Sequence, residues 1–266
     1  MTRYRLLAAD MDGTLLDSRG AIADETVREI RRISEAGVLF VVTTGRPIQG
    51  VEKYRPPLRL DGPVVTYNGA EIVDGRTRET LFERKLLRSD ARRIVELGLR
   101  RGATMCIWSG NRLYGNKLDA RIGEYKRLSG VEPRLVEDWE TLLDRGISKI
   151  LWTDEPERIR EARKEVSAEA FGEVEVCTSK PVFLEFFNRR ATKAAALEFI
   201  GRRHGIGREE MVAIGDGAND VDMIRYAGMG VAMGNADEAV KRAARYTTSS
   251  NDENGVASAI RRFFGD

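Results

Sequence analysis

The stretch Leu6-Leu7-Ala8-Ala9-Asp10-Met11-Asp12-Gly13-Thr14 decides how the rest of the chain is interpreted. Its apolar half predicts a short buried strand of a parallel sheet, apolar on both faces. Ligands of an open α/β sheet bind beyond the carboxyl ends of its strands, where Asp10 and Asp12 stand. Residues two apart on a strand point to the same side until the chain turns, here at Gly13. We therefore expect both carboxylates to lie within reach of a ligand.

Two neighbouring carboxylates repel each other, and each loses hydration on burial. A divalent cation offsets both costs, and Mg²⁺ prefers such hard oxygen ligands. The alternative is an ordinary polar turn at the end of a strand, because Asp and Gly are common turn residues. The rest of the chain has to distinguish a Mg²⁺ site at Asp10 and Asp12 from that turn.

The composition limits the class of protein. The chain has 266 residues, of which 42% are hydrophobic and 32% charged, as expected of a globular α/β protein. Lys and Arg number 44 against 42 Asp and Glu, and this balance argues against a nucleic-acid partner. The single histidine, His204, precedes Gly205 in a basic helix end, so carboxylates and lysine are better candidates for proton transfer. No apolar run approaches the roughly 20 residues of a membrane span. We expect a cytoplasmic protein with no membrane partner.

Two further apolar strands end in polar residues. The strand Val38–Val42 runs into Thr44-Gly45, a hydroxyl and an amide suited to gripping phosphate; an ordinary helix N-cap is the alternative. The strand Met211–Ile214 runs into Gly215-Asp216-Gly217-Ala218-Asn219-Asp220. That loop lacks the third glycine of a dinucleotide fingerprint, and its acidic residues would repel pyrophosphate. In a doubly wound sheet these ends meet the end of the first strand at one edge, and Lys193 at a helix start can reach it.

Between these motifs lies a self-sufficient α/β segment of three or four strands and two or more helices. We interpret residues 84–186 as a domain inserted into a core made of residues 1–83 and 187–266. Asn68-Gly69, between strand-forming residues, predicts a hairpin, and Ser179-Lys180-Pro181 a second one. Polar or basic candidates for substrate contacts in the inserted segment are Asn111, Arg112, Lys117 and Arg121, although ordinary solvated surface is favoured over a ligand contact for each of them.

Phosphoryl transfer explains the whole set of motifs. It requires a nucleophile in line with the leaving oxygen, positive charge near the equatorial oxygens and donors that fix the phosphate. A carboxylate, Mg²⁺, a lysine and several hydroxyl or amide donors supply these together.

The four motifs resemble those of the haloacid dehalogenase-like phosphatases. They are Asp10-Met11-Asp12-Gly13-Thr14, Thr44-Gly45-Arg46, Lys193 and Gly215–Asp220. Their order and spacing resemble the Cof-type subfamily, whose C2-type cap domain is inserted between the second and third motifs. The resemblance implies a doubly wound, Rossmann-like parallel-sheet core with a smaller α+β cap that sets substrate specificity.

The same resemblance implies roles for the motif residues. Asp10 would be the nucleophile that forms an aspartyl-phosphate, and Asp12 the general acid and then the base for water. Related ion-pumping ATPases carry Thr at the position of Asp12, so hydrolysis is favoured here. The other roles are phosphate binding by Thr44, Gly45, Lys193 and Asn219, and Mg²⁺ binding by Asp10, Asp12, Asp216 and Asp220, with Asp220 acting directly or by orienting the site.

We therefore expect a Mg²⁺-dependent phosphatase that acts on small phosphorylated metabolites such as sugar phosphates. Two alternatives stay open. Phosphomannomutases resemble this chain in motifs and cap, so a phosphomutase is the nearest one. A binding protein that kept the fold without catalysis is the other. The sequence does not indicate the oligomeric state.

Overall fold

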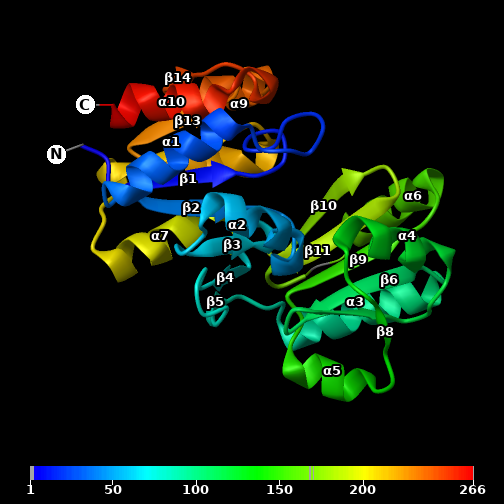
Figure 1. Cartoon of the computed structure of the whole chain (residues 1–266). Coiled ribbons are helices and arrows are strands. Elements are labelled where there is room, and N and C mark those ends of the chain that lie inside the picture. The colour runs from blue at the N-terminus through cyan, green and yellow to red at the C-terminus, as the bar shows by residue number, and fades with distance from the viewer. Residues whose placement is uncertain (1–2, 168, 170, 266) are drawn as a thin grey trace. The chain divides into compact units, whose positions relative to one another are not determined.

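The computed structural model describes residues 3–167, 169 and 171–265. By their internal contacts the residues form two compact units (Figure 1). The first unit comprises Met1–Phe82 and Thr192–Asp266, and the second comprises Glu83–Ala191. The chain thus leaves the first unit once and returns to it once.

The first unit contains an eight-stranded sheet in the order β14-β13-β12-β1-β2-β3-β4-β5. The pairs from β14 to β3 are parallel, and β3 pairs antiparallel with β4. The strand order reverses at β1, which lies between β2 and β12, so β1 stands at the switch point where ligands of such sheets bind. The strands are β1 (Leu6–Asp10), β2 (Leu39–Thr43), β3 (Val64–Thr66), β4 (Glu71–Val73), β5 (Thr80–Glu83, whose last residue belongs to the second unit), β12 (Met211–Gly215), β13 (Met229–Ala232) and β14 (Tyr246–Thr247).

Helices cover both faces of this sheet. On one face Leu7 and Ala9 of β1 pack in a cluster that includes Ile30 and Ile260. On the other face, Leu6 and Ala8 of β1 pack in a cluster with residues of α7 and α8. Because both faces are covered, β1 has to be apolar up to its last residue, Asp10, as its sequence is. The prediction of a doubly wound α/β fold is confirmed. The helices are α1 (Asp24–Glu35), α2 (Arg55–Leu58), α7 (Lys193–His204), α8 (Val221–Tyr226), α9 (Glu238–Ala243) and α10 (Gly255–Phe264).

Helix α7 begins and ends where its sequence predicts. The Thr192 hydroxyl accepts a hydrogen bond from the amide of Ala195 at 3.1 Å, which caps the first turn. Gly205 follows His204 with φ of 61°, a left-handed conformation that costs glycine little. The cap fixes Lys193 as the first helical residue.

The hairpin predicted at Asn68-Gly69 is confirmed, with a different turn. Strands β3 and β4 pair antiparallel. A 3₁₀ turn of Tyr67–Gly69 joins them, rather than a two-residue Asn-Gly turn. Tyr67 and Asn68 have φ of 50° and 57°, so two successive non-glycine residues are left-handed. Tertiary contacts of this turn, described below, account for the departure.

The second unit contains a six-stranded sheet in the order β10-β11-β9-β6-β7-β8, antiparallel except for the β7–β8 pair. Residues of α3, α5 and α6 form a hydrophobic core with one face of the sheet. The strands are β6 (Thr104–Ser109), β7 (Arg112–Gly115), β8 (Arg134–Leu135), β9 (Lys149–Thr153), β10 (Val174–Lys180) and β11 (Phe183–Asn188), and the helices are α3 (Arg88–Arg100), α4 (Ala120–Ser129), α5 (Trp139–Arg145) and α6 (Pro156–Ser167).

The last hairpin of this unit turns later than the sequence indicated. Strand β10 extends through Lys180, and Lys180 pairs with Phe183 across the turn. The turn therefore lies at Pro181-Val182, because proline ends the strand without donating a ladder hydrogen bond. The ladder has an irregular register between Cys177 and Lys180, which lengthens β10 beyond its apolar part.

A buried ion pair lies in the second unit. Lys149 Nζ is 2.5 Å from a carboxylate oxygen of Glu185, and the two side chains are 9% and 7% exposed. Burial alone would lower the pKa of Lys149, but the charge of Glu185 outweighs it and the pKa is raised. Nearby, the Trp108 indole donates a hydrogen bond to the Tyr125 hydroxyl at 2.9 Å.

Candidate active site

The carboxyl ends of β1, β2 and β12 bring the predicted motifs to one edge of the sheet. Asp10 ends β1 and pairs in register with Thr43 of β2, so Thr44 follows at the same level. Strand β12 lies on the other side of β1 and ends at Gly215, directly before Asp216. Parallel pairing therefore places Asp10 between the loops that carry Thr44 and Asp216.

Lys193 lies between two carboxylates at this edge. Its ammonium contacts Asp10 Oδ1 and lies 2.5 Å from Asp220 Oδ1. Lys193 and Asp220 are each 1% exposed and Asp10 is 5% exposed, so the three charges are removed from water. A buried charge has to be paired to persist, and each of these three is.

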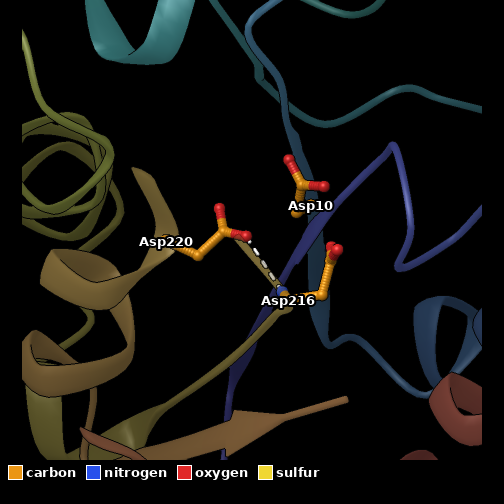
Figure 2. Close-up of side chains that lie close together, drawn as sticks. All are labelled: Asp10, Asp216 and Asp220. Atoms are coloured by element: carbon orange, nitrogen blue, oxygen red, sulfur yellow. Dashed lines mark hydrogen bonds between the residues drawn. The ribbon is translucent and has the colours of Figure 1, made fainter. Parts of the chain in front are cut away.

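Asp216 and Asp220 are fixed by different donors. The Thr14 hydroxyl donates to Asp216 Oδ1 at 2.7 Å. Asp220 Oδ2 accepts from the amides of Asp216 and Gly217, at 3.0 and 2.9 Å. With Lys193 on Oδ1, both oxygens of Asp220 accept hydrogen bonds from the chain. Figure 2 shows the Asp216–Asp220 bond beside Asp10.

The electrostatics of the cluster favour a cation. Burial raises the pKa of Asp10 to about 7, Lys193 opposes the rise, and the charges of Asp220 and Asp216 add to it. Burial also raises the pKa of Asp216, against its hydrogen bond from Thr14. Burial would lower the pKa of Lys193, yet the charges of Asp10 and Asp220 raise it. One cation thus faces three carboxylates, and negative charge remains in excess.

The residues present fit a divalent metal ion. One oxygen from each of Asp10, Asp216 and Asp220 can be chosen so that all three lie within 4.8 Å of one another. Gly13, with φ of 79°, approaches so closely that a Cβ there would lie 2.3 Å from Asp216 Oδ2. Hard oxygen donors with excess negative charge suit Mg²⁺. The glycine of the first motif therefore leaves room for the Asp216 carboxylate.

Asp12 lies apart from this acidic cluster and pairs with Arg46. Arg46 Nε is 2.8 Å from Asp12 Oδ2, and Nη2 is 2.5 Å from Oδ1. The Asp12 side chain is 57% exposed, in contrast to buried Asp10. We did not predict a role for Arg46, although it directly follows Gly45 in the second motif. A guanidinium that holds a carboxylate with two nitrogens sets its orientation.

Thr44 and Asn219 both form hydrogen bonds with Asn68, which lies in the turn that we predicted only as part of a hairpin. Asn219 Nδ2 donates to Asn68 Oδ1 at 2.9 Å, and the Asn68 amide donates to the Thr44 carbonyl at 2.9 Å. The Thr44 hydroxyl accepts from the amide of Arg46 at 3.1 Å. Thr14 and Asn68 were thus also missed: Thr14 was visible within the first motif, whereas nothing in the local sequence relates Asn68 to Asn219.

The fold and these motifs define a class of protein, and the chain belongs to it. Residues 7–260 match the model of the haloacid dehalogenase-like hydrolase family. The chain is therefore a member of that hydrolase family, as the motifs predicted.

Particular relatives match over nearly the full length. The chain is 34% identical over 262 residues to 5-amino-6-(5-phospho-D-ribitylamino)uracil phosphatase YcsE of Bacillus subtilis (strain 168), with 97% of this chain and 95% of the relative covered. A haloacid dehalogenase-like hydrolase from Bacteroides thetaiotaomicron is 34% identical, with a TM-score of 0.88 over 97% of this chain and 99% of the other. A crystal structure from Thermotoga maritima is 30% identical, with a TM-score of 0.89 over 97% of both chains.

Among residues 3–167, 169 and 171–265, none of the helices is long and apolar enough to cross a membrane.

Proposed function

We propose that the protein is a Mg²⁺-dependent phosphatase that hydrolyses small phosphorylated metabolites through an aspartyl-phosphate on Asp10. The observation that carries this proposal is the contact of Lys193 with the buried Asp10 at the switch-point edge. The relative from Bacillus subtilis is named a phosphatase, which supports the same reaction class.

In the first half-reaction an oxygen of Asp10 attacks phosphorus. The bond to the leaving oxygen breaks, and Asp12 gives that oxygen a proton. In the second half-reaction Asp12 takes a proton from water, whose oxygen attacks phosphorus and releases the Asp10 carboxylate with inorganic phosphate. Asp12 ends with the proton it began with, so the cycle balances. Its exposed position suits a group that exchanges protons with a departing alcohol and with water.

The remaining residues hold the phosphoryl group. Lys193 supplies a buried positive charge, the Thr44 hydroxyl and Gly45 amide supply donors, and Asn219 supplies its side-chain amide. Preorganised donors cost little reorganisation when charge moves onto the phosphoryl oxygens. Asn219 is exposed on its loop, so it can face an incoming ligand.

Mg²⁺ would be held by the carboxylates of Asp10 and Asp216 and by the main-chain carbonyl of Asp12. When bound, it neutralises charge on the phosphoryl oxygens. We assign Asp220 to orienting Lys193 and the Asp216 loop rather than to direct metal binding, because it accepts hydrogen bonds from Lys193 and from the amides of Asp216 and Gly217, whereas Asp216 accepts one from Thr14.

We also propose that the second unit, expected as residues 84–186, is a cap that selects the substrate. The ribityl phosphate in the name of the Bacillus relative favours phosphorylated sugars or polyols. Two of the four candidate side chains are occupied: Lys117 donates to the Gly102 carbonyl, and Arg121 lies 2.8 Å from Glu155. Asn111 is left-handed in the β6–β7 turn, whereas Arg112 is exposed, which makes Arg112 the better candidate for a ligand contact.

The proposal is tested with p-nitrophenyl phosphate and a panel of sugar and polyol phosphates. The wild-type protein should release phosphate with Mg²⁺, lose activity with EDTA and regain it with added Mg²⁺. Asp10→Asn should reduce turnover to background. Normal turnover by Asp10→Asn would refute the assignment of the nucleophile.

The same panel separates the alternatives. Free phosphate from a hexose phosphate supports a phosphatase, whereas an isomeric sugar phosphate indicates a phosphomutase. A binding protein without catalysis would release no phosphate from any substrate.

A further inference from the structure

We propose that Asn68 is a positioning residue of the active site, whose side chain orients the amide of Asn219 for phosphate binding. This inference rests on the proposed function and adds a residue that none of the four motifs contains. It starts from the Tyr67–Gly69 turn, which contacts the loops of three motifs.

The first contact is with the fourth motif. Asn68 Oδ1 accepts the hydrogen bond from Asn219 Nδ2 at 2.9 Å. An amide side chain has two N–H donors and one oxygen acceptor. With one N–H held by Asn68, the Asn219 amide has a defined orientation, and its other N–H is available to a phosphoryl oxygen.

The second contact is with the motif that contains Thr44. The Asn68 amide donates to the Thr44 carbonyl at 2.9 Å, and the Tyr67 amide donates to the Arg46 carbonyl at 3.2 Å. A Cβ on Gly45 would lie 3.1 Å from Asn68 Oδ1. The side chain of Asn68 therefore packs directly on the backbone of Thr44-Gly45, the predicted phosphate-binding segment.

The third contact is with the start of α7. Gly69 has φ of 104°, and a Cβ there would lie 2.2 Å from the Thr192 carbonyl oxygen. A side chain at position 69 would thus collide with the residue that caps the helix of Lys193. The turn packs against the three segments that carry Thr44, Lys193 and Asn219.

The backbone of the turn is strained, in keeping with a functional role. Tyr67 and Asn68 both have positive φ, in the left-handed region that residues other than glycine seldom adopt. Asparagine adopts left-handed backbone angles more readily than most residues do. A bulky residue such as the buried Tyr67 rarely adopts them. An isolated hairpin would adopt a less strained turn, so the contacts with Thr44, Thr192 and Asn219 explain why this conformation is kept.

The test uses Asn68→Gly, which keeps the left-handed turn and the backbone amide but removes the side chain. Asn254→Gly is a matched control. Asn254 has nearly the same backbone angles, with φ of 58° against 57°, is also half-buried, and makes one side-chain hydrogen bond, to Glu25 at 2.8 Å. It belongs to none of the motifs.

We expect Asn68→Gly to lower kcat/KM for p-nitrophenyl phosphate by about tenfold and to weaken inhibition by inorganic phosphate by a similar factor, as for one lost hydrogen bond. Asn254→Gly should keep wild-type kinetics with a comparable change in Tm. A double-mutant cycle with Asn219→Ala measures the coupling between the two side chains in kcat/KM, and a merely structural role of Asn68 would produce no such coupling. If Asn68 acts through Asn219, the double variant should be no slower than Asn219→Ala alone.

Two results would overturn the proposal: wild-type kinetics in Asn68→Gly, or losses of Asn68→Gly and Asn219→Ala that multiply in the double variant. Failure of the proposed function is distinguishable, because the wild-type protein would then release no phosphate. The rise in Tm caused by inorganic phosphate with Mg²⁺ needs no turnover, and it should be smaller in Asn68→Gly than in Asn254→Gly. An equal rise in both variants would also reject the role of Asn68.

Discussion

Arg46 holds both carboxylate oxygens of Asp12 through two guanidinium nitrogens, while Asp10, two residues earlier, is held by Lys193. The two aspartates of one motif thus have separate cationic partners, one half-buried and one fully buried. Their different surroundings match the different roles proposed for them.

Arg46→Lys should lower kcat/KM by about tenfold, because an ammonium cannot hold both oxygens in the fixed geometry of a guanidinium. Steady-state kinetics with p-nitrophenyl phosphate measure this. Arg19→Lys is the matched control, since Arg19 contacts Asp17 through Nε at 3.1 Å and Nη2 at 2.8 Å outside the site. Equal kinetics for both variants would argue against a role of Arg46 in orienting Asp12.

Thr14→Val should weaken Mg²⁺ binding by roughly 10- to 100-fold, as for other residues that orient a metal ligand. The variant keeps the shape of Thr14 but loses the hydrogen bond to Asp216. The Mg²⁺ dependence of activity should shift to higher concentration, with kcat restored at saturation. Thr248→Val removes a buried hydrogen bond of the same 2.7 Å length, to the Gly255 carbonyl, and should leave the Mg²⁺ dependence unchanged. An unshifted curve for Thr14→Val would count against Asp216 as a ligand.

Lys193→Met should abolish activity and destabilise the fold by about 3–5 kcal/mol, since Asp10 and Asp220 then remain buried without their cation. Urea unfolding at pH 7 measures the stability, and phosphate release measures the activity. Lys241→Met is the control, because Lys241 pairs with an exposed side chain, that of Glu238, on a helix surface. If Lys193→Met releases phosphate at a rate close to that of the wild-type protein, Lys193 has no role in phosphate binding.

Lys149→Met should destabilise the second unit by about 3–5 kcal/mol, because it leaves Glu185 buried and unpaired. The double variant Lys149→Met, Glu185→Leu should recover most of the loss. The raised pKa of Lys149 means that the pair contributes fully below the unfolded pKa of about 10.4 and is lost only as pH rises through the folded value. The free energy of unfolding attributable to the pair should therefore be constant between pH 6 and 9. A double variant less stable than Lys149→Met would contradict this account.

The two cysteines should react slowly with iodoacetamide in the folded protein. Burial raises the pKa of Cys177 to about 11, and burial also raises the pKa of Cys106. Thiolate is the reactive form, so labelling of Cys177 should increase about tenfold per pH unit above pH 8. Mass spectrometry of labelled peptides in buffer and in urea distinguishes the sites. Rapid labelling of Cys106 in buffer would show that its strand opens readily.

Strand pairing explains which parts of the site the amino-acid sequence could predict. Asp10, Thr44 and Asp216 each follow a parallel strand, and the rule that such strands end at one edge is sufficient to bring them together. The capped start of α7 likewise places Lys193 from its local sequence. Their chemical roles stay predictions until the variants are measured.

The contacts that sequence could not predict all depend on loop conformation. Asp12 meets Arg46 because the chain turns at Gly13, and Asn68 meets Asn219 because Tyr67 and Asn68 take left-handed backbone angles. No periodicity encodes such a pairing across 151 residues. The late turn of the β10–β11 hairpin was likewise not predicted, since the ladder has an irregular register between Cys177 and Lys180.

The return of the chain from the second unit has a practical consequence for building chimeras. Only Thr192 separates Ala191, the last residue of that unit, from Lys193, whereas the outgoing junction at Glu83 lies at the end of β5, an edge strand that carries none of the motif residues. Exchanging the second unit between relatives should therefore tolerate changes of length at the outgoing junction. At the return junction no spare residue precedes the cap, so a change of length there would displace the Thr192 hydroxyl that caps α7 and with it the ammonium of Lys193 beside Asp10. The permissible splice sites of this enzyme are thus asymmetric.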